Sequence, residues 1–539
     1  MKFGETPLDD AAGAILAHSV RRDGLAFKKG RVLTPDDITA LRDTGIDTVV
    51  AARLDADDVG EDDAATRIAK AAQGAGLRAT SAFTGRVNLV ADAQGIAVID
   101  PQVEALNLIH EAITVATLPR WELVDAKQIV ATIKVIPFAA PAKVVADCEA
   151  LAGRIAGGMI RVAALQPKRI GLIQTRLAGT KESVLDKTRN VLEARLQTLG
   201  GTLVGELRCP HESAGLAAAI TKIQTDSVDI VLIAGASAIT DRRDVIPAAI
   251  MVSGGIIDHF GMPVDPGNLL MVARIADTPV VGLPGCARSP KLNGVDWILQ
   301  RLCADLPVAS ADIMAMGVGG LLKEIPGRPQ PRSAGEPRPA APHAPRVAAL
   351  ILAAGQSRRM GPLNKLLQPV DGKPMVQWAV EAARESHVEA VYVVVGHEAQ
   401  AVRAALDGDA VSFIDNPDYA DGISTSIRRA VATLPDELDG AVVCLGDMPR
   451  IGPQQIDRLI AAFNPVEGRS ICIPTWRGKR GNPVLIGRQF FAEIQEISGD
   501  VGARYLIGQY PDLVCEVEMD DDAVLVDVDT PQALDALSA

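Results

Sequence analysis

The sequence of 539 residues has few aromatic side chains, no closely spaced cysteine pair and no long apolar run. Phe, Trp and Tyr make up 3% of the chain, too little for the stacking platforms that bind single-stranded nucleic acid. The formal net charge of −13 also argues against nucleic acid, because such binding depends on neutralising many phosphates. The 7 cysteines lack a C-x-x-C pair, so they indicate neither a disulfide framework nor a zinc site.

The chain also lacks the features of a membrane or secreted protein. No stretch approaches the roughly 20 uninterrupted apolar residues that a membrane-spanning helix needs. The opening residues MKFGE contain no apolar region of the kind found in signal peptides. We therefore expect a cytoplasmic protein that contacts no membrane, and its 48% hydrophobic content suffices for two or three cores.

A proline-rich segment divides the chain. Residues 326–345 read PGRPQPRSAGEPRPAAPHAP, with seven prolines and no large apolar side chain. Such a segment favours extended polyproline geometry, which predicts a linker between folded parts and leaves a ligand for another protein as the alternative. We predict an N-terminal region at 1–165, an α/β domain at 166–325, this linker, and a C-terminal α/β domain at 346–539.

Alternating strand and helix patterns characterise the segment 166–325. The pattern predicts strands at residues 169–174, 202–207 and 229–234, with helices at 181–199 and 216–224. This succession indicates a βαβ fold with parallel strands, although no dinucleotide-binding glycine motif is present.

The loop LAAGQSRRMGPLNKLL (residues 352–367) follows an apolar run at 347–351 and is typical of a phosphate-binding turn. Gly355 and Gly361 permit close approach of the backbone, and Arg358, Arg359 and Lys365 offset phosphate charge. The spacing fits neither the Walker A motif nor a dinucleotide-binding turn. A solvated basic turn between strand and helix is the alternative interpretation.

Two aspartates follow further predicted strands. Residues 442–445 lead to Asp447, and residues 523–526, which we predict to be a strand, lead to Asp529. Open α/β sheets bind ligands at this edge, and Mg²⁺ takes one or two carboxylates together with phosphate oxygens. We therefore predict a Mg²⁺ site at Asp447 and Asp529, with turn or helix-cap roles as the alternatives.

Six motifs together resemble a known family. They are LAAGQSRRMG (352–361), NPDYADGISTSIR (416–428), LGDMP (445–449), RGNPVLI (480–486), SGDVGARYL (498–506) and DVDTP (527–531). In this order over about 190 residues they resemble the molybdenum cofactor cytidylyltransferases. The resemblance implies a three-layer, Rossmann-like nucleotidyltransferase domain of the GT-A kind. It also implies transfer of CMP from CTP to the terminal phosphate of molybdopterin, and a molybdenum hydroxylase or its chaperone as partner.

The resemblance also implies a role for individual residues. Arg359, Lys365 and Asp447 would be catalytic, with Asp447 and Asp529 holding Mg²⁺. The substrate-binding residues would be Leu352, Ala353, Ala354 and Gly355 for the nucleotide, Gly422, Ser424 and Ser426 beside its base or ribose, and Asn482 near the pterin phosphate. Guanylyltransferase relatives read LAGG where this chain has LAAG, which favours CTP over GTP.

The segment GASAITDRRDVIP (residues 235–247) resembles the molybdopterin-binding fold of proteins that adenylylate molybdopterin or insert molybdate. The match implies cofactor binding at Asp244, which could instead cap the following helix. His211 stands near the position where the adenylylating proteins carry an aspartate. The start of the chain resembles the molybdate-inserting proteins weakly, and its Lys28, Lys29 and Arg31 are typical of a solvated turn.

Three functions remain open at this point. The first is the cytidylyltransferase, with guanylyl transfer to the same cofactor as a variant. The second is a sugar-phosphate nucleotidyltransferase on the same fold. The third is a non-catalytic carrier that binds and protects molybdenum cofactor.

Overall fold

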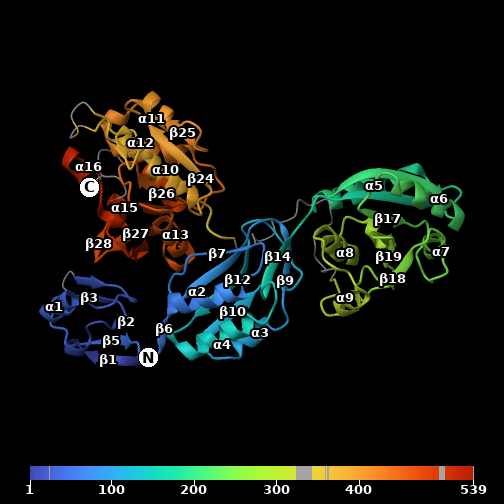
Figure 1. The fold of residues 1–539 in the computed structure, drawn as a ribbon, viewed down its shortest axis with the longest axis horizontal. Coiled ribbons are helices and arrows are strands. Elements are labelled where there is room, and N and C mark those ends of the chain that lie inside the picture. Colours follow the sequence, from blue (N-terminus) through green and yellow to red (C-terminus); the bar gives the residue numbers. More distant parts are fainter. Residues whose placement is uncertain (23–24, 323–342, 358–359, 361–362, 497–503, 538–539) are drawn as a thin grey trace.

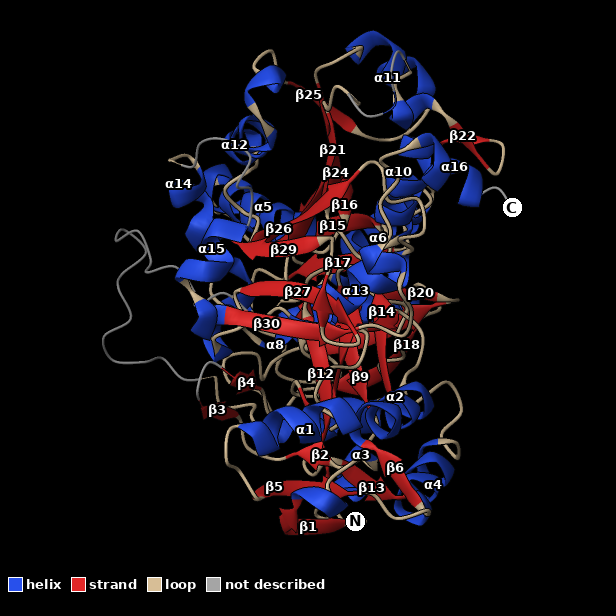
Figure 2. Ribbon diagram, turned by 90° about the vertical axis from the view of Figure 1, so that its left-hand side faces the viewer, coloured by secondary structure: helices blue, strands red, loops and turns tan. Residues whose placement is uncertain are grey.

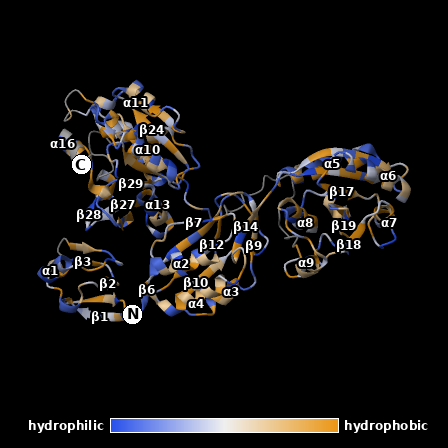
Figure 3. Cartoon of the chain, in the orientation of Figure 1, coloured by the Kyte–Doolittle hydropathy of each residue, from blue (hydrophilic) through white to orange (hydrophobic). Residues whose placement is uncertain are grey.

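A computed structural model describes residues 1–22, 25–322, 343–357, 360, 363–496 and 504–537. The chain has a mixed α/β fold with several separate sheets, two of which contain parallel strands (Figure 1). Apolar side chains gather between the helices and strands of each part of the chain. Figure 3 colours the ribbon by hydropathy and shows hydrophobic stretches in every part. Within the described ranges no helix is both long and apolar enough to cross a membrane.

A small antiparallel sheet with strand order β1-β5-β2 opens the chain. Its elements are β1 (Lys2–Pro7), β2 (Ile15–Leu16), β5 (Thr48–Arg53), the hairpin β3 (Val20–Arg22) and β4 (Leu25–Phe27), and helix α1 (Pro35–Asp43). Arg31 bonds to the Asp37 carboxylate at 2.8 Å, and Lys28 donates to the carbonyl of Val514 in the C-terminal domain. The prediction of a solvated turn is therefore wrong for Lys28 and Arg31, because both cations bind oxygen atoms of the protein.

The next part of the chain has antiparallel sheets covered by helices. Its strands are β6 (Asp58–Gly60), β7 (Leu77–Ala79), β8 (Arg86–Ala91), β9 (Gly95–Ile99), β10 (Ile113–Thr117), β11 (Leu123–Val124), β12 (Ile129–Val135), β13 (Ala139–Pro141) and β14 (Ile160–Ala164). The helices are α2 (Glu61–Ala72), α3 (Val103–Asn107) and α4 (Ala142–Ala152). Ile68 of α2, Val145 of α4 and Ile133 of β12 are completely buried in one shared core.

A six-stranded sheet follows, with strand order β16-β15-β17-β20-β19-β18. Its strands are β15 (Arg169–Arg176), β16 (Thr202–Pro210), β17 (Ile230–Ala234), β18 (Ile256–Phe260), β19 (Met271–Ile275) and β20 (Thr278–Leu283). Its helices are α5 (Glu182–Gln197), α6 (Ser213–Gln224), α7 (Val245–Val252), α8 (Gly294–Cys303) and α9 (Ser310–Met314). The first four strands in this order are parallel, which confirms the predicted βαβ succession.

The C-terminal domain is built on a sheet with strand order β25-β24-β21-β26-β29-β27-β28, and β30 pairs with β27. Its strands are β21 (Val347–Ala353), β24 (Ala390–Val395), β25 (Ser412–Asp415), β26 (Gly440–Leu445), β27 (Ile471–Trp476), β28 (Lys479–Arg480), β29 (Val484–Gly487) and β30 (Val514–Glu518). The helices are α10 (Met375–Glu385), α11 (Ala399–Ala405), α12 (Ile423–Thr433), α13 (Pro453–Ala462), α14 (Phe491–Ile494), α15 (Arg504–Gln509) and α16 (Pro531–Leu537).

Helices cover both faces of this sheet, which explains its continuous apolar strands. Ala349 and Ile351 of β21 pack with α10 and α13, whereas Ala348 and Leu350 pack with α12 on the other face. Figure 2 shows the strands between these helices, with α10 and α16 on one side and α12, α14 and α15 on the other. A parallel strand buried on both faces reads as an unbroken apolar run, so the predicted three-layer α/β class is confirmed.

The strand predicted at residues 523–526 does not exist. Ala523–Leu525 is a turn of 3-10 helix, in which Ala523 and Val524 are buried. The Asp521 carboxylate accepts a hydrogen bond from the Ala523 N–H at 3.0 Å, and this local bond starts a turn instead of a strand. A run of four apolar residues is too short to distinguish the two conformations.

Most of the proline-rich linker lies outside the described residues. At its end the Ala344 N–H donates to the Lys127 carbonyl at 3.1 Å, and Lys127 pairs with Glu389 of the C-terminal domain. The chain therefore enters β21 in contact with the antiparallel part that precedes the six-stranded sheet.

Candidate functional site

A cavity of about 690 Å³ lies at the carboxyl edge of the C-terminal sheet. Leu352 of β21 pairs with Leu445 of β26, so the loops that follow these parallel strands reach the same place. This is the edge at which open α/β sheets bind ligands. The lining residues are Leu352, Ala354, Gly355, Gln356, Ser357, Lys365, Leu366, Tyr419, Ala420, Asp421, Gly422, Ile423, Ser426, Leu445, Asp447 and Asp529.

The loop after β21 forms one wall of this cavity. A Cβ atom added to Gly355 would meet no protein atom within 4 Å, so the backbone there borders open space. A ligand oxygen can approach such a backbone closely. Of the four predicted nucleotide-binding residues, Leu352, Ala354 and Gly355 line the cavity, whereas Ala353 points into the core.

Lys365 lies between two carboxylates in the cavity. Its ammonium pairs with Asp447 and with Asp529, the second at 2.6 Å. The Lys365 and Asp447 side chains are only 13% and 16% exposed. Burial lowers the pKa of Lys365, but attraction to Asp447 and hydrogen bonds to both carboxylates outweigh it and raise that pKa above its usual value. The ammonium therefore stays charged in the folded protein.

The carboxylate of Asp447 has unused bonding capacity. Its Oδ1 atom is buried and accepts no hydrogen bond from the described residues. Such an atom costs free energy unless a cation or donor occupies the site, so the donor set fits a hard cation. In the described part of the chain no three His, Cys, Asp or Glu side chains cluster as metal ligands. A cation here would therefore take most of its ligands from a bound molecule and water.

Charge in this cavity favours a metal as well. The described lining residues include one cation, Lys365, against the carboxylates of Asp421, Asp447 and Asp529. A triphosphate brings three or four further negative charges, so it needs additional positive charge to bind here. Arg359, predicted to be catalytic, and its neighbour Arg358 lie outside the described residues.

The start of α12 forms the opposite wall. Gly422 adopts φ +110°, a conformation that favours glycine, and both Gly422 and Ser426 line the cavity. The Asn416 side-chain amide donates to the Thr425 and Ser426 hydroxyls at 2.9 Å each and holds this turn in place. Ser424, predicted beside the base or ribose, is instead buried and is not part of the lining.

Two predicted residues lie elsewhere. Asn482 sits between β28 and β29, where its N–H donates to the Val524 carbonyl at 3.0 Å, and it does not line the cavity. Asp244 caps α7, because its side chain accepts from the Val245 N–H at 2.8 Å. Its local contacts therefore fit the capping alternative, and its role in cofactor binding stays a prediction.

The prediction missed several lining residues, among them Tyr419 and Asp421. Both belong to a short 3-10 turn, Tyr419–Asp421, within the motif that supplied Gly422 and Ser426. The motif at residues 416–428 was a sufficient signal to include the whole turn among the predicted site residues. The sequence alone does not show which side chains of a turn face the ligand.

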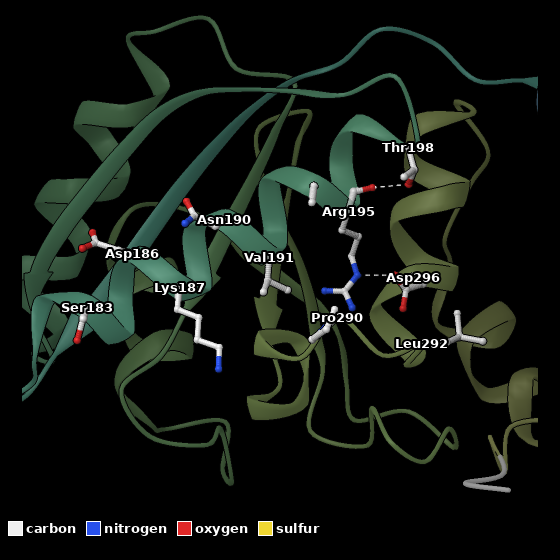
Figure 4. A pocket seen from close by; sticks show the side chains of 11 residues that line it. Ser183, Asp186, Lys187, Asn190, Val191, Arg195, Thr198, Pro290, Leu292 and Asp296 are labelled. Carbon is white, nitrogen blue, oxygen red and sulfur yellow. Dashed lines mark hydrogen bonds and ion pairs between the residues drawn. The ribbon is translucent and has the colours of Figure 1, made fainter. Parts of the chain in front are cut away.

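A second hollow of about 730 Å³ lies between α5 and the loop before α8 (Figure 4). Its deepest charged group, Arg195, points at Asp296, with 2.5 Å between the guanidinium and the carboxylate. The same guanidinium donates to the carbonyls of Ala287, Ser289 and Lys291. Protein groups occupy this cation, so it ties the loop to the helices.

Comparison with protein families identifies the class of the C-terminal domain. Residues 349–514 match the family described as the MobA-like NTP transferase domain, and residues 5–53 match a domain of unknown function. The C-terminal region is therefore a MobA-like NTP transferase domain, which supports an enzyme of the nucleotidyltransferase class.

Individual relatives match about a third of the chain or less. Nicotine blue oxidoreductase of Paenarthrobacter nicotinovorans is 28% identical over 195 residues, which are 35% of this chain and 95% of that protein. The bifunctional protein GlmU of Geobacter metallireducens is 37% identical over 145 residues, 26% of this chain. The match spans only 29% of that GlmU.

Solved structures cover the same share. Rv0371c from Mycobacterium tuberculosis H37Rv is 28% identical, with 36% of this chain and 98% of that chain covered and a TM-score of 0.33. Its complex with manganese has a TM-score of 0.31 at the same identity, with 36% and 97% of the two chains covered.

Proposed function

We propose that the C-terminal domain transfers CMP from CTP to the terminal phosphate of molybdopterin, giving the cytosine dinucleotide cofactor and pyrophosphate. The observation that carries the proposal is the convergence of Lys365, Asp447 and Asp529 in one cavity beside Gly355. The six motifs that resemble the cytidylyltransferases supply the nature of the substrates. One fold can host several chemistries, as the relative named an oxidoreductase illustrates. The proposed reaction therefore rests on the residues of the site and not on the fold.

The proposed reaction needs no general base. A phosphate monoester is already anionic at neutral pH, so its oxygen attacks the α-phosphorus of CTP directly. A new P–O bond forms there, and the bond to the departing pyrophosphate breaks. Among the described lining residues there is no histidine, which is consistent with catalysis by alignment and charge stabilisation.

Asp447 and Asp529 would hold the divalent cation, and Lys365 would contact the triphosphate. Mg²⁺, when bound, would neutralise phosphate charge. The Lys365 ammonium now lies between the two carboxylates. We propose that it donates to the pyrophosphate in the substrate complex, with Arg359 as a second cation.

The methyl group of Ala354 would favour a pyrimidine nucleotide. Ala354 lines the cavity and is only 4% exposed, so its side chain forms part of a tight wall. Guanylyltransferase relatives have glycine at the matching position. We propose that this wall favours CTP over GTP.

We further propose that the domain with the six-stranded sheet binds molybdopterin. Support comes from its parallel βαβ topology and from the resemblance of residues 235–247 to the molybdopterin-binding fold. The dinucleotide product would pass to a molybdenum hydroxylase or its chaperone.

A sugar-phosphate nucleotidyltransferase is the second candidate, favoured by the 37% identity to GlmU over 145 residues. Incubation with Mg²⁺ and CTP, GTP or UTP, with molybdopterin or sugar phosphates as acceptors, separates the candidates by pyrophosphate release. The proposal requires that CTP with molybdopterin releases more pyrophosphate than every other pair of nucleotide and acceptor. Release with UTP and a sugar phosphate would contradict it. Tight binding of molybdopterin without release of pyrophosphate from any pair would favour the non-catalytic carrier of molybdenum cofactor.

A further inference from the structure

A small cavity of about 100 Å³ lies at the carboxyl edge of the six-stranded sheet. The loop after β17 (Gly235, Ala236, Ser237 and Ala238) and the turn after β20 (Pro284, Gly285 and Arg288) form its mouth. Among the described residues that line it, Arg288 is the single charged side chain and no carboxylate is present. The cavity is therefore suited to an anionic ligand.

Three side chains form a hydrogen-bonded chain that ends at Ser237 in the cavity lining, one from the end of β15 and two from the loops after β16 and β17. Thr175, at the end of β15, contacts His211 Nδ1 through its hydroxyl at 2.8 Å. The other ring nitrogen, His211 Nε2, contacts the Ser237 hydroxyl at 2.9 Å. The Thr175 oxygen also accepts from the Ala236 N–H at 2.8 Å. This bond fixes the chain to the loop that carries Ser237.

The direction of these bonds follows from the burial of Thr175. Its side chain is 1% exposed, so its hydroxyl proton needs an acceptor inside the protein. Within the described residues its partners are the Ala236 N–H, which only donates, and the imidazole of His211. Thr175 therefore donates to Nδ1, which places the ring proton on Nε2. Nε2 then donates to the Ser237 oxygen, which leaves the proton of this exposed hydroxyl available to solvent or to a bound ligand.

We infer that Thr175 and His211 position Ser237 as a hydrogen-bond donor to a phosphomonoester in this cavity, with Arg288 supplying the positive charge. The inference excludes a role for His211 as the base that activates a serine nucleophile, because its Nε2 carries the proton. Arg288 donates to the Gly235 carbonyl, so the cation is held against the same loop. Only the identity of the full ligand rests on the proposed molybdopterin-binding function.

The hydrogen-bonded chain from Thr175 through His211 to Ser237 is called the relay below. Nitrogen-detected NMR on the full chain labelled with ¹⁵N-histidine tests this relay directly. The signals of His211 are assigned by their loss in His211→Gln. We expect them to show the Nε2–H form at pH 8. Thr175→Val removes the donor to Nδ1 and should increase the Nδ1–H form. An Nδ1–H ring in the unaltered protein, or a tautomer ratio insensitive to Thr175→Val, would overturn the relay.

A matched control exists in the same domain. Ser310 contacts His259 Nδ1 at 2.8 Å but does not line the cavity. Titration with inorganic phosphate should shift the His211 signals, and Ser237→Ala should weaken this binding about tenfold. Ser237→Thr should retain it, and Ser310→Ala should leave it unchanged. Equal phosphate affinity in Ser237→Ala, or covalent labelling of Ser237 by a fluorophosphonate, would contradict the donor role.

Molybdopterin, titrated separately, distinguishes the two proposals. If phosphate binding depends on Ser237 and molybdopterin does not bind, the relay stands and the proposed ligand of this domain is wrong. If molybdopterin binds the unaltered protein and Ser237→Ala equally well, the relay is wrong and the proposed function stands.

Discussion

The Lys365 ammonium and the Asp447 carboxylate form an ion pair between residues 82 positions apart in the chain. Asp529 reaches the same ammonium at 2.6 Å, so one cation lies between two carboxylates that would otherwise repel each other. A divalent cation bound at the carboxylates would compete with Lys365 and leave its ammonium available to an anionic substrate. The site thus contains the parts that the proposed transfer needs.

Lys365→Ala is expected to fold normally and to turn over poorly. Loss of one well-placed cation should lower kcat/KM by about a hundredfold, or roughly 3 kcal/mol of transition-state stabilisation. Steady-state pyrophosphate release, together with a thermal melt, measures both effects. Lys373→Ala is the control, because Lys373 pairs with Glu381 and does not line the cavity. Equal losses in the two variants would contradict a specific role for Lys365.

Asp447→Asn keeps the shape of the side chain and removes its charge. We expect about a hundredfold lower turnover and a higher Mg²⁺ concentration at half-maximal rate, because the buried carboxylate holds the cation. A Mg²⁺ titration of the rate gives both values. Asp436→Asn changes a fully exposed carboxylate of the same domain and should have no effect. An unchanged Mg²⁺ requirement in Asp447→Asn would show that the metal binds elsewhere.

Ala354→Gly should relax the choice of nucleotide. Removing one methyl group from a cavity wall changes discrimination by about tenfold or more, so the ratio of kcat/KM for CTP to that for GTP should fall by about that factor. Ala353→Gly provides the control, since Ala353 packs in the core on the other face of the sheet and does not line the cavity. A constant ratio in Ala354→Gly would remove this residue from nucleotide selection.

Two half-buried cysteines should respond differently to pH. A hydrogen bond from the Cys472 thiol lowers the pKa of Cys515, whereas burial raises the pKa of Cys286. The thiolate is the reactive form, so alkylation of Cys286 should slow about tenfold per pH unit from pH 9 to 7, while Cys515 should slow less. Peptide mass spectrometry after iodoacetamide labelling measures both rates.

Cys472→Ala removes the donor and supplies the control for that experiment. The pKa of Cys515 should rise in this variant, so its labelling at pH 7 should slow while that of Cys286 stays the same. Burial also raises the pKa of Cys444 to about 12, so this residue should stay unlabelled throughout. Parallel pH profiles for Cys286 and Cys515 would contradict the hydrogen bond.

Much of the C-terminal fold could be predicted because its central strands are buried on both faces. Val347–Ala353 and Gly440–Leu445 read as apolar runs for that reason, and the loop glycine and Asp447 follow directly at the sheet edge. By contrast, the first three of the four apolar residues from Ala523 form a 3-10 turn that begins with a local hydrogen bond to Asp521.

Contacts between separate loops could not be predicted. Sequence spacing assigned Lys365 to the triphosphate and Asp447 to the metal, but it gave no sign that the two side chains pair with each other. The same holds for His211 and Ser237, which follow β16 and β17 and approach each other because both strands flank β15 and end at the same edge of the sheet. Ser424 is buried whereas Ser426 lines the cavity, and the sequence does not show which side of α12 each of them faces.

The central claim is that the cavity beside Gly355 holds a triphosphate together with a metal on Asp447. A crystal structure with CTP and Mn²⁺ tests this claim most directly, because the anomalous scattering of Mn²⁺ locates the metal. We predict a metal peak about 2 Å from an Asp447 oxygen, the triphosphate along the loop after β21, and Lys365 moved from Asp447 to a phosphate oxygen. A metal or triphosphate outside this cavity, or Lys365 still paired with Asp447 when CTP is bound, would contradict the account.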